Sequence, residues 1–443
     1  MKKLYLLLVF FSISIGNVLA KEPGSKPRVI VMTDGEIDDH SSMIRFLMYT
    51  SDMDVCAIIE TNSIFQRYGH SNEDWYEKQL EAYSQVYPNL IKHNPDYPTA
   101  EYLRKISFIG DEDSTHLSGL RKKRWELIPG AEITYKPDNW ADTPGSDKIV
   151  EVLLEDNPEP VHIQAWGGGN TAARAFYKLK TQYPDDYKRA VSKVTMYNIW
   201  YQDGAGNYIE KYHPDVTMIY NGSFNGTWNY KRQTKTYDFI EHHVKTNHGP
   251  LGALYPQDYV SEGDSPAFFY TIANGLRNHE HPTYGGWGGR YEKIPGFERV
   301  YKDAVDDGDK LTSLKIWIDD VNRDFQARMD WCVAEKYTDA NHNPIIKVKE
   351  ELDRTVSSGE TVTINAKKTN DPDGDEFSFK WWQYKEAGSY EGSVNLQNPQ
   401  AGVATFVAPK VNKPETIHII LEVKDNGDPA LKSYKRMIIK VMP

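Results

Sequence analysis

The chain has 443 residues, of which 52 are Lys or Arg and 63 are Asp or Glu, so its formal net charge is −11. This acidic balance argues against nucleic acid or an anionic membrane surface as the partner. The length allows two or three domains. We expect the two cysteines, Cys56 and Cys332, to be free thiols, because a fold of this size needs no disulfide. A disulfide between them is the alternative.

The first twenty residues have the pattern of a secretory signal. Two lysines precede an apolar run that ends at Ile15, and the small-residue ending at Ala20 predicts cleavage after that residue. The apolar run is shorter than the roughly 20 residues that a membrane-spanning helix needs. We therefore expect a periplasmic or secreted protein with no integral membrane association.

Apolar runs alternate with amphipathic runs through the following three quarters of the chain. Strands are expected at 28–32, 55–60, 161–166, 193–200 and 215–220, and helices at 39–49, 73–86, 148–156 and 171–180. This alternation predicts an α/β domain with a mainly parallel sheet. The polar stretches TDGEIDD, ETNS, AWGGGNT and NIWYQDGAGN follow predicted strands. Ligands of such sheets bind outside the carboxyl ends of the strands, so these stretches are expected to meet at a site.

The pattern changes near residues 341–344, after which short alternating strands are separated by the turns DPDGD and DNGDP. This predicts an immunoglobulin-like β-sandwich. The predicted division is a signal peptide (1–20), an α/β domain (21–343) and a sandwich (344–443). Neighbouring residues of a strand point to opposite faces. Trp381 and Trp382 therefore cannot both face the core, and with Tyr384 they either bind glycan or, as we expect, pack against the α/β domain.

Three aspartates crowd one turn, where the first predicted strand ends and a helix begins: Asp34, Asp38 and Asp39. The turn is open to three interpretations, a solvated acidic loop, a helix cap and a cation site. One aspartate is explained by capping alone, but three within one turn need a counter-charge, which a hard divalent cation supplies. Arg45 could neutralise part of this charge, although a surface ion pair is the expected role.

The stretch TDGEIDD after an apolar strand resembles the calcium-binding DxDPGxDD motif of nucleoside hydrolases. Asp34 matches the second aspartate of that pattern, and Asp38 and Asp39 match its closing pair. Two departures stand out. Met32 takes the place of the first aspartate, and the letters GE replace PG.

A second stretch, VHIQAWGGGNTAARAF, resembles the strand–loop–helix of the same family in which a backbone carbonyl completes the calcium shell. The resemblance implies that this carbonyl is the one of Trp166. Asp264 is the best match for a late aspartate that binds metal and sugar, although a plain helix cap would also explain it. Gly263 precedes it, where the family commonly has a histidine that assists purine departure, and this departure argues against a nucleoside substrate.

Three asparagines complete the predicted site. Asn62, in ETNS, resembles the sugar-contacting asparagine of nucleoside hydrolases, and Asn198 and Asn207 are further predicted hydrogen-bond partners of the sugar. For Asn198 and Asn207 a role in the turn stays open beside that function.

The resemblance covers roughly residues 27–335. Together with the appended sandwich, the layout is similar to exported nucleoside hydrolase-like proteins described as cellulose-binding. It implies a carbohydrate context and leaves hydrolysis and binding both open. With the aspartates and the signal peptide, the first hypothesis is a calcium-dependent glycoside hydrolase that acts on plant or algal polysaccharide fragments, in which a water held by the metal attacks the anomeric carbon. Asp34 would ligate Ca²⁺ and take the proton of that water; Asp39, Asp264 and the Trp166 carbonyl would complete the shell, and Asp38 would bind ring hydroxyls.

The leaving group also needs a general acid, and the sequence offers several titratable side chains for it: Glu36, His40, His213, His242, His243, His248, His279 and His281. Two other functions stay open, a non-catalytic carbohydrate (cellulose)-binding protein on a nucleoside hydrolase fold and a nucleoside hydrolase. The family resemblance also implies a homo-oligomer, which the appended sandwich could prevent.

Overall fold

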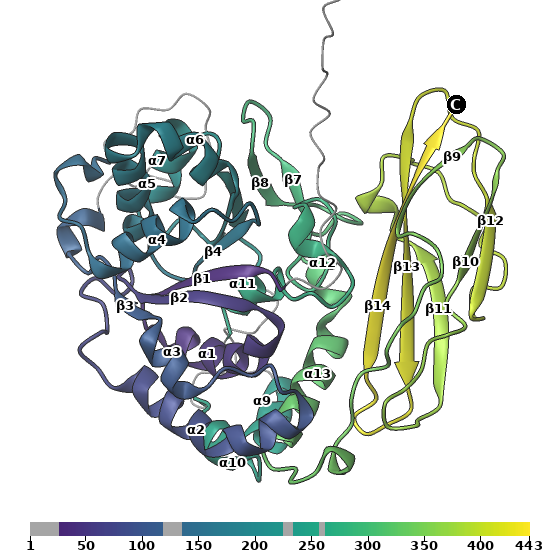
Figure 1. Cartoon of the computed structure of the whole chain (residues 1–443), viewed down its shortest axis with the longest axis horizontal. Coiled ribbons are helices and arrows are strands. Elements are labelled where there is room, and N and C mark those ends of the chain that lie inside the picture. Colours follow the sequence, from purple (N-terminus) through teal and green to yellow (C-terminus); the bar gives the residue numbers. More distant parts are fainter. Residues whose placement is uncertain (1–25, 118–134, 225–233, 257–261) are drawn as a thin grey trace, which may run out of the picture.

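The computed structural model describes residues 26–117, 135–224, 234–256 and 262–443, so the predicted signal peptide lies outside it. Figure 1 shows an α/β part and an all-β part side by side. The α/β part has one sheet of eight strands in the order β3-β2-β1-β4-β5-β6-β8-β7. Its parallel strands are β1 (Arg28–Thr33), β2 (Asp54–Glu60), β3 (Ser107–Ile109), β4 (Val161–Ala165), β5 (Val194–Ile199), β6 (Thr217–Asn221) and β8 (Val300–Asp303). The edge strand β7 (Tyr291–Lys293) runs antiparallel to β8.

Helices cover both faces of this sheet, as expected for strands that are buried on both sides. They are α1 (Ile37–Tyr49), α2 (Trp75–His93), α3 (Ala100–Lys105), α4 (Pro144–Leu154), α5 (Asn170–Gln182), α6 (Pro184–Ser192), α7 (Ala205–Tyr212), α9 (Thr234–Ile240), α10 (Gly249–Ala253), α11 (Ser265–Phe269), α12 (Thr312–Lys315) and α13 (Ile318–Trp331). The helices α1, α2, α10, α11 and α13 share one apolar cluster with Val29 and Val31 of β1. The helices α4 to α7 share another cluster with Ile30 and Met32. The alternation along β1 therefore builds one core on each face.

The C-terminal part consists of two sheets, β10-β12 and β11-β13-β14-β9. Its strands are β9 (Asp353–Ser357), β10 (Thr361–Asn365), β11 (Phe377–Gln383), β12 (Val403–Val407), β13 (Glu415–Asp425) and β14 (Lys432–Met442). Apolar side chains from both sheets form one shared cluster, in which Val362 and Phe406 of one sheet join Leu421 and Ile439 of the other. The two sheets therefore pack face to face, and the predicted all-β sandwich is confirmed.

Side chains of the sandwich fix it to the α/β part. Buried Arg436 of β14 donates to the carbonyls of Leu276 (2.6 Å) and Gly285 (2.7 Å). The hydroxyl of Tyr434 donates to the Asp320 carboxylate at 2.8 Å. Figure 1 shows α12 and α13 facing β13 and β14 across this junction.

The structure also shows where the two cysteines and the adjacent tryptophans of the sandwich lie. Cys56 and Cys332 are free, as expected, although only Cys332 is fully buried. Trp381 lies in the sandwich core, whereas Trp382 packs against the α/β part, so the prediction of opposite faces is confirmed. Within the described part of the chain, none of the helices combines the length and the apolar character that crossing a membrane requires.

Candidate functional site

The predicted acidic turn lies at the carboxyl edge of the parallel sheet, where the strand order reverses. The chain leaves β1 toward β2 on one side, and β4 occupies the other side of β1. Asp34 directly follows β1 and Trp166 directly follows β4. The crevice between two such diverging connections is the general ligand site of open α/β sheets.

Three carboxylates meet here from distant parts of the chain. Asp38 and Asp39 belong to the first turn of α1, and Asp264 directly precedes α11. Each offers an oxygen, and these three oxygens lie within 4.8 Å of one another. The backbone N–H of Asp264 donates to the Ser42 hydroxyl at 3.3 Å, which ties the two helix starts together. We call Asp38, Asp39 and Asp264 the acidic triad.

The triad and the adjacent Asp34 are buried, with at most 4% of any of these residues exposed. Both carboxylate oxygens of Asp34 and Oδ2 of Asp264 form no well-aligned hydrogen bond to the described residues. Asp39 accepts from the Thr33 hydroxyl and from the Asp34 backbone N–H, the latter at 3.2 Å. No Lys or Arg of the described ranges lies within ion-pair distance of Asp34, Asp39 or Asp264.

The expectation of a surface ion pair for Arg45 is wrong. Its side chain is 2% exposed and pairs with Glu262, whose side chain is 4% exposed, at 2.6 Å. The guanidinium also lies 4.1 Å from the ring centroid of Phe325. Glu262 further accepts from the hydroxyls of Tyr255 (2.7 Å) and Ser265 (2.9 Å). Because Glu262 takes up this cation, Arg45 positions the segment before Asp264 and gives Asp39 and Asp264 no ion pair.

Burial and mutual repulsion both act on these carboxyl groups. Burial raises the pKa of Asp39 well above its usual range, and the charges of Asp34 and Asp38 add to this shift. The pKa of Asp264 is raised in the same way, by burial first and then by Asp39 and Asp38. Burial also raises the pKa of Asp34, although the nearby Ser63 hydroxyl opposes the shift. In the protein alone, burial therefore disfavours the charged form of these groups.

The donor set fits a hard divalent cation. Calcium is bound by oxygen ligands at about 2.3–2.6 Å, so two ligands of one ion are at most about 5 Å apart. The oxygens of the acidic triad meet this limit. The unpartnered oxygen of Asp264 gives the group an unused ligand atom. Met32, which takes the place of the first aspartate in the resembled motif, lies instead in the apolar cluster beneath α4 and α5.

Asp34 lies against the glycine-rich turn after β4. A Cβ atom added to Gly167 would lie 2.6 Å from Cβ of Asp34, so only glycine fits at that position. The carbonyl of Trp166 accepts a hydrogen bond from Nε2 of Gln202. The other end of that amide, Oε1, is buried without a partner among the described residues. Gln202 was not singled out from the sequence, although it lies in the polar stretch NIWYQDGAGN that follows β5.

A cavity of about 270 Å³ opens beside the triad. Its lining consists of Glu36, Asp38, Asp39, Phe65, Trp166, Ile199, Trp200, Gln202, Phe224 and Asp264. Trp200 and Phe224 meet edge to face at 4.8 Å. Trp200 has φ of 58°, a left-handed conformation that is rare for a bulky residue and is frequent at functional sites. The cavity thus combines carboxylates on one side with aromatic rings on the other.

Sequence reasoning missed this aromatic wall. Trp200 directly follows β5, and Phe224 comes three residues after β6. Aromatic residues at strand ends carry no charge pattern, so the sequence did not single them out as site residues. Phe65 follows ETNS and is 42% exposed, which marks it as available to a ligand.

The three predicted asparagines do not line this cavity. Both ends of the Asn62 amide are used, since Oδ1 accepts from Asn170 at 2.7 Å and Nδ2 donates to the Arg67 carbonyl at 2.9 Å. Asn198 donates to the carbonyls of Met196 and Ile219. Asn207 is buried in α7, and its amide has no partner in the described structure. Asn62 and Asn198 therefore hold strand ends and turns in place.

Of the predicted general acids, Glu36 alone belongs to the lining of the cavity as described. Its pKa is raised to about 8 by burial and by the charges of Asp38 and Asp34. His40 stacks on Trp75 at 4.5 Å beside the triad. The remaining histidines are elsewhere: His213 bonds Tyr187, His248 pairs with Asp330, His242 and His243 lie in the segment 241–245, and His279 and His281 line a separate cavity at the amino ends of the strands.

Comparisons with known proteins agree with this architecture. The family profile described as "Cellulose-binding Sde182, nucleoside hydrolase-like domain" matches residues 28–291, and "Cellulose-binding protein Sde0182, C-terminal domain" matches residues 361–441. No curated protein sequence matches the chain.

Among solved structures, a nucleoside hydrolase-related hypothetical protein from Saccharophagus degradans, associated with carbohydrate metabolism, is similar over 94% of this chain and 100% of its own. The identity is 32% and the TM-score 0.80. A plant nucleoside hydrolase is similar over 68% of this chain and 98% of its own, at 12% identity and a TM-score of 0.37. An inosine-guanosine nucleoside hydrolase is similar over 68% of this chain and 98% of its own, at 12% identity and a TM-score of 0.35.

Proposed function

The chain belongs to the cellulose-binding, nucleoside hydrolase-like family, and from this premise we propose that it binds a neutral glycan at the carboxyl edge of its parallel sheet, through a calcium ion held by the acidic triad. The observation that carries the proposal is the cavity of about 270 Å³, which places three buried carboxylates within 4.8 Å of one another opposite aromatic rings. Its volume lies near the lower end of the range for ligand pockets, roughly 300–1,000 Å³. It therefore suits a short part of a glycan chain.

Each side of the cavity contributes a different interaction. Asp39 and Asp264 would hold the cation, and Asp38 would share it or accept from sugar hydroxyls. When bound, calcium neutralises the carboxylates and polarises the hydroxyl groups and water that it coordinates. Trp200 and Phe224 offer ring faces and edges for the C–H surface of a pyranose, as large aromatic side chains do in many ligand pockets.

Isothermal titration calorimetry with cellobiose tests this function directly. We expect binding in 1 mM calcium chloride and none after chelation with EDTA. Asp264→Asn should remove the calcium-dependent binding, because the triad loses a charged ligand. Asp185→Asn is the matched control, since that exposed aspartate also lies in the first turn of a helix. Equal cellobiose affinity with and without EDTA would refute the proposal.

Glycoside hydrolysis is a second candidate function, favoured by the unpartnered carboxylate of Asp34 beside the cavity. There Asp34 would take the proton of the attacking water. Glu36, which also lines the cavity, would protonate the leaving oxygen, so that the two carboxyl groups divide the roles of base and acid. Reducing-end release from cello-oligosaccharides by the wild type, abolished in Asp34→Asn while calcium binding persists, would establish this activity.

A nucleoside substrate fits the cavity less well. Gly263 precedes Asp264, and the described lining contains no histidine that could protonate a departing purine. Absence of free hypoxanthine after incubation with inosine would agree with this assignment, and its release would overturn it. The predicted signal peptide supports export to the periplasm or beyond the cell, where polysaccharide is the expected ligand.

A further inference from the structure

A second cavity, of about 320 Å³, lies between the α/β part and the sandwich. Trp317 contributes to its wall from the start of α13, and Trp382 contributes from β11 on the other side. We call it the aromatic groove and define it by six lining residues: Asp307, Trp317, Lys380, Trp382, Tyr384 and Glu386.

Three aromatic rings from the two parts of the molecule meet in this groove. The ring centroids of Trp317 and Trp382 are 6.0 Å apart, and those of Trp382 and Tyr384 are 5.3 Å apart. Trp317 and Tyr384 are each 2% exposed, so they form the floor, whereas Trp382 is half-buried and keeps part of its ring accessible. The Trp382 indole donates to Glu422 at 2.7 Å, which fixes the orientation of that ring.

The polar groups around the rings select the chemistry of the ligand. Asp307 and Glu386 are exposed carboxylates, and the Lys380 side chain is 65% exposed. Acceptors and donors beside a fixed ring suit a neutral polyhydroxyl chain, which stacks on the ring and bonds through its hydroxyls. In total four carboxylates and two lysines line the groove, so the negative balance disfavours an anionic ligand.

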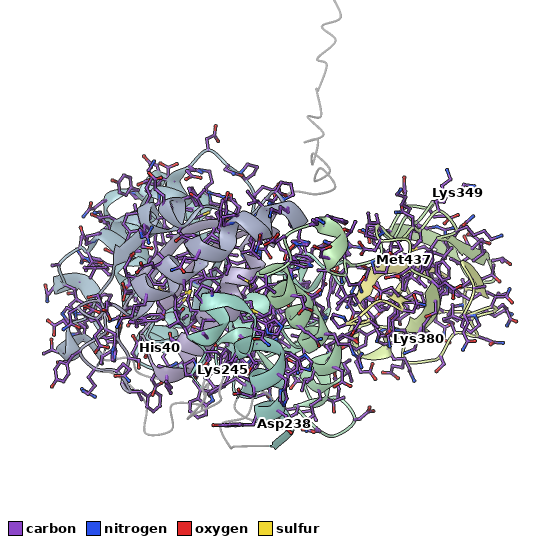
Figure 2. The ribbon with its side chains drawn as sticks, turned by 90° about the horizontal axis from the view of Figure 1, so that it is seen from below. His40, Asp238, Lys245, Lys349, Lys380 and Met437 are labelled. Atoms are coloured by element: carbon purple, nitrogen blue, oxygen red, sulfur yellow. The ribbon has the colours of Figure 1, made fainter. Side chains whose placement is uncertain are left out.

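The groove and the triad's cavity border the same set of loops. Phe224, which lines the cavity, follows β6, and its neighbour Ser223 donates to the Lys310 carbonyl at 3.5 Å. Lys310 lies in the segment between Asp307 of the groove and α12. The cavity thus extends to the carboxyl end of β6, and one wall of the groove follows the carboxyl end of the adjacent strand β8. In Figure 2, His40 marks the α/β side and Lys380 the sandwich side of the molecule.

We propose that the aromatic groove is a second glycan subsite, which holds the distal part of a neutral β-linked glucan chain whose other end occupies the triad's cavity. This inference rests on the proposed function for the identity of the ligand class. It gives the sandwich a role in binding long chains, beyond the packing that Trp382 and Tyr384 also provide.

The test compares cellobiose with cellohexaose by isothermal titration calorimetry on the full mature chain in calcium. Trp382→Ala should weaken cellohexaose binding at least tenfold and change cellobiose binding less than twofold, because only the longer chain reaches the groove. Trp382→Phe should retain most of the affinity, since it keeps a ring. Glu386→Gln, at an exposed site that cannot unfold the chain, should weaken cellohexaose alone by a few-fold. Val407→Ala, exposed on the far strand β12, is the control.

The outcomes separate the two proposals. Unchanged cellohexaose affinity in folded Trp382→Ala and Glu386→Gln overturns the groove and leaves the triad's cavity intact. If Asp264→Asn keeps full cellohexaose affinity while Trp382→Ala loses it, the cavity proposal fails and the groove stands as the glycan site. No binding of either sugar by the wild type overturns both.

Discussion

The described part of the chain carries two groups of three aspartates whose carboxylate oxygens lie within 4.8 Å of one another. One is the acidic triad at the edge of the parallel sheet, and the other is a turn of the sandwich, formed by Asp371, Asp373 and Asp375. In the sequence they look alike, because each contains acidic residues at close spacing. In the structure the two groups differ in burial, since the triad is fully buried and the residues of the turn are exposed or half-buried.

The sandwich turn is bonded internally, although Oδ2 of Asp371 is buried without a partner among the described residues. Oδ1 of Asp371 accepts from the backbone N–H groups of Asp373 (2.9 Å) and Asp375 (3.1 Å). A carboxylate oxygen of Asp373 lies 3.0 Å from Nδ1 of His342, and the three residues of the turn are exposed or half-buried. The acidic triad is fully buried, and neither Asp39 nor Asp264 forms an ion pair within the described ranges. Burial without compensation therefore distinguishes a candidate cation site from an acidic turn.

The largest expected effect is on the triad itself. Asp264→Asn should lower calcium affinity about 100-fold or more, because even residues that only support metal ligands cost 10–100-fold when changed. Without calcium the same variant should be more stable than the wild type by roughly 1–3 kcal/mol, since an unpartnered buried charge disappears. Calorimetric titration and urea unfolding, each with and without EDTA, measure the two effects. A variant that is less stable in EDTA would contradict this account of the triad.

Replacing the buried cationic side chain of Arg45 should also have a large effect, here on the free energy of unfolding. Arg45→Met leaves Glu262 buried without its partner, and such a broken pair typically costs about 3–5 kcal/mol. Urea unfolding measures this loss, and the double variant Arg45→Met with Glu262→Gln should recover a large part of it. If the double variant is no more stable than Arg45→Met alone, the two side chains are not coupled as the structure indicates.

Much of this arrangement could be predicted from the sequence because the signals are local. The strand RVIVM and the helix after it, the acidic turn between them and the strands of the sandwich follow from periodicity and turn residues within short windows. The parallel sheet then places Asp34 and Trp166 at one edge without further information. Asp264 was matched through the family motif, since nothing in its own surroundings distinguishes a ligand from a helix cap.

The remainder depends on contacts between residues far apart in the chain. Arg45 meets Glu262 across 217 positions, so no local pattern could show that this cation is already paired. The amide of Asn62 bonds Asn170 across 108 positions. The side chain that was predicted to contact sugar therefore supports the glycine-rich turn. Local patterns predicted where charges gather, and the tertiary structure decides which of them are already compensated.

A substitution in the glycine-rich turn beside the triad should have an effect of intermediate size on stability and calcium binding. Gly167→Ala would place a methyl group 2.6 Å from Cβ of Asp34, so we expect about 1–3 kcal/mol of destabilisation and weaker calcium binding. Gly402→Ala is the control, because its nearest neighbour is the flexible Lys367 side chain at 3.1 Å. Unfolding curves and calcium titrations of both variants measure the difference. Equal behaviour would show that Asp34 moves freely and does not depend on the turn.

The smallest effect is expected in the sandwich turn, and it completes the comparison. Asp373→Asn removes one charge from a solvated group and keeps an oxygen that accepts from His342, so stability should change by about 0.5–1 kcal/mol at most. Calorimetry should give one calcium per chain in the wild type and in this variant, because the aspartates of the turn are less buried than the triad and accept backbone hydrogen bonds. If the wild type binds a second calcium and this variant does not, the sandwich turn is a calcium site as well. Burial would then no longer distinguish a calcium site from an acidic turn.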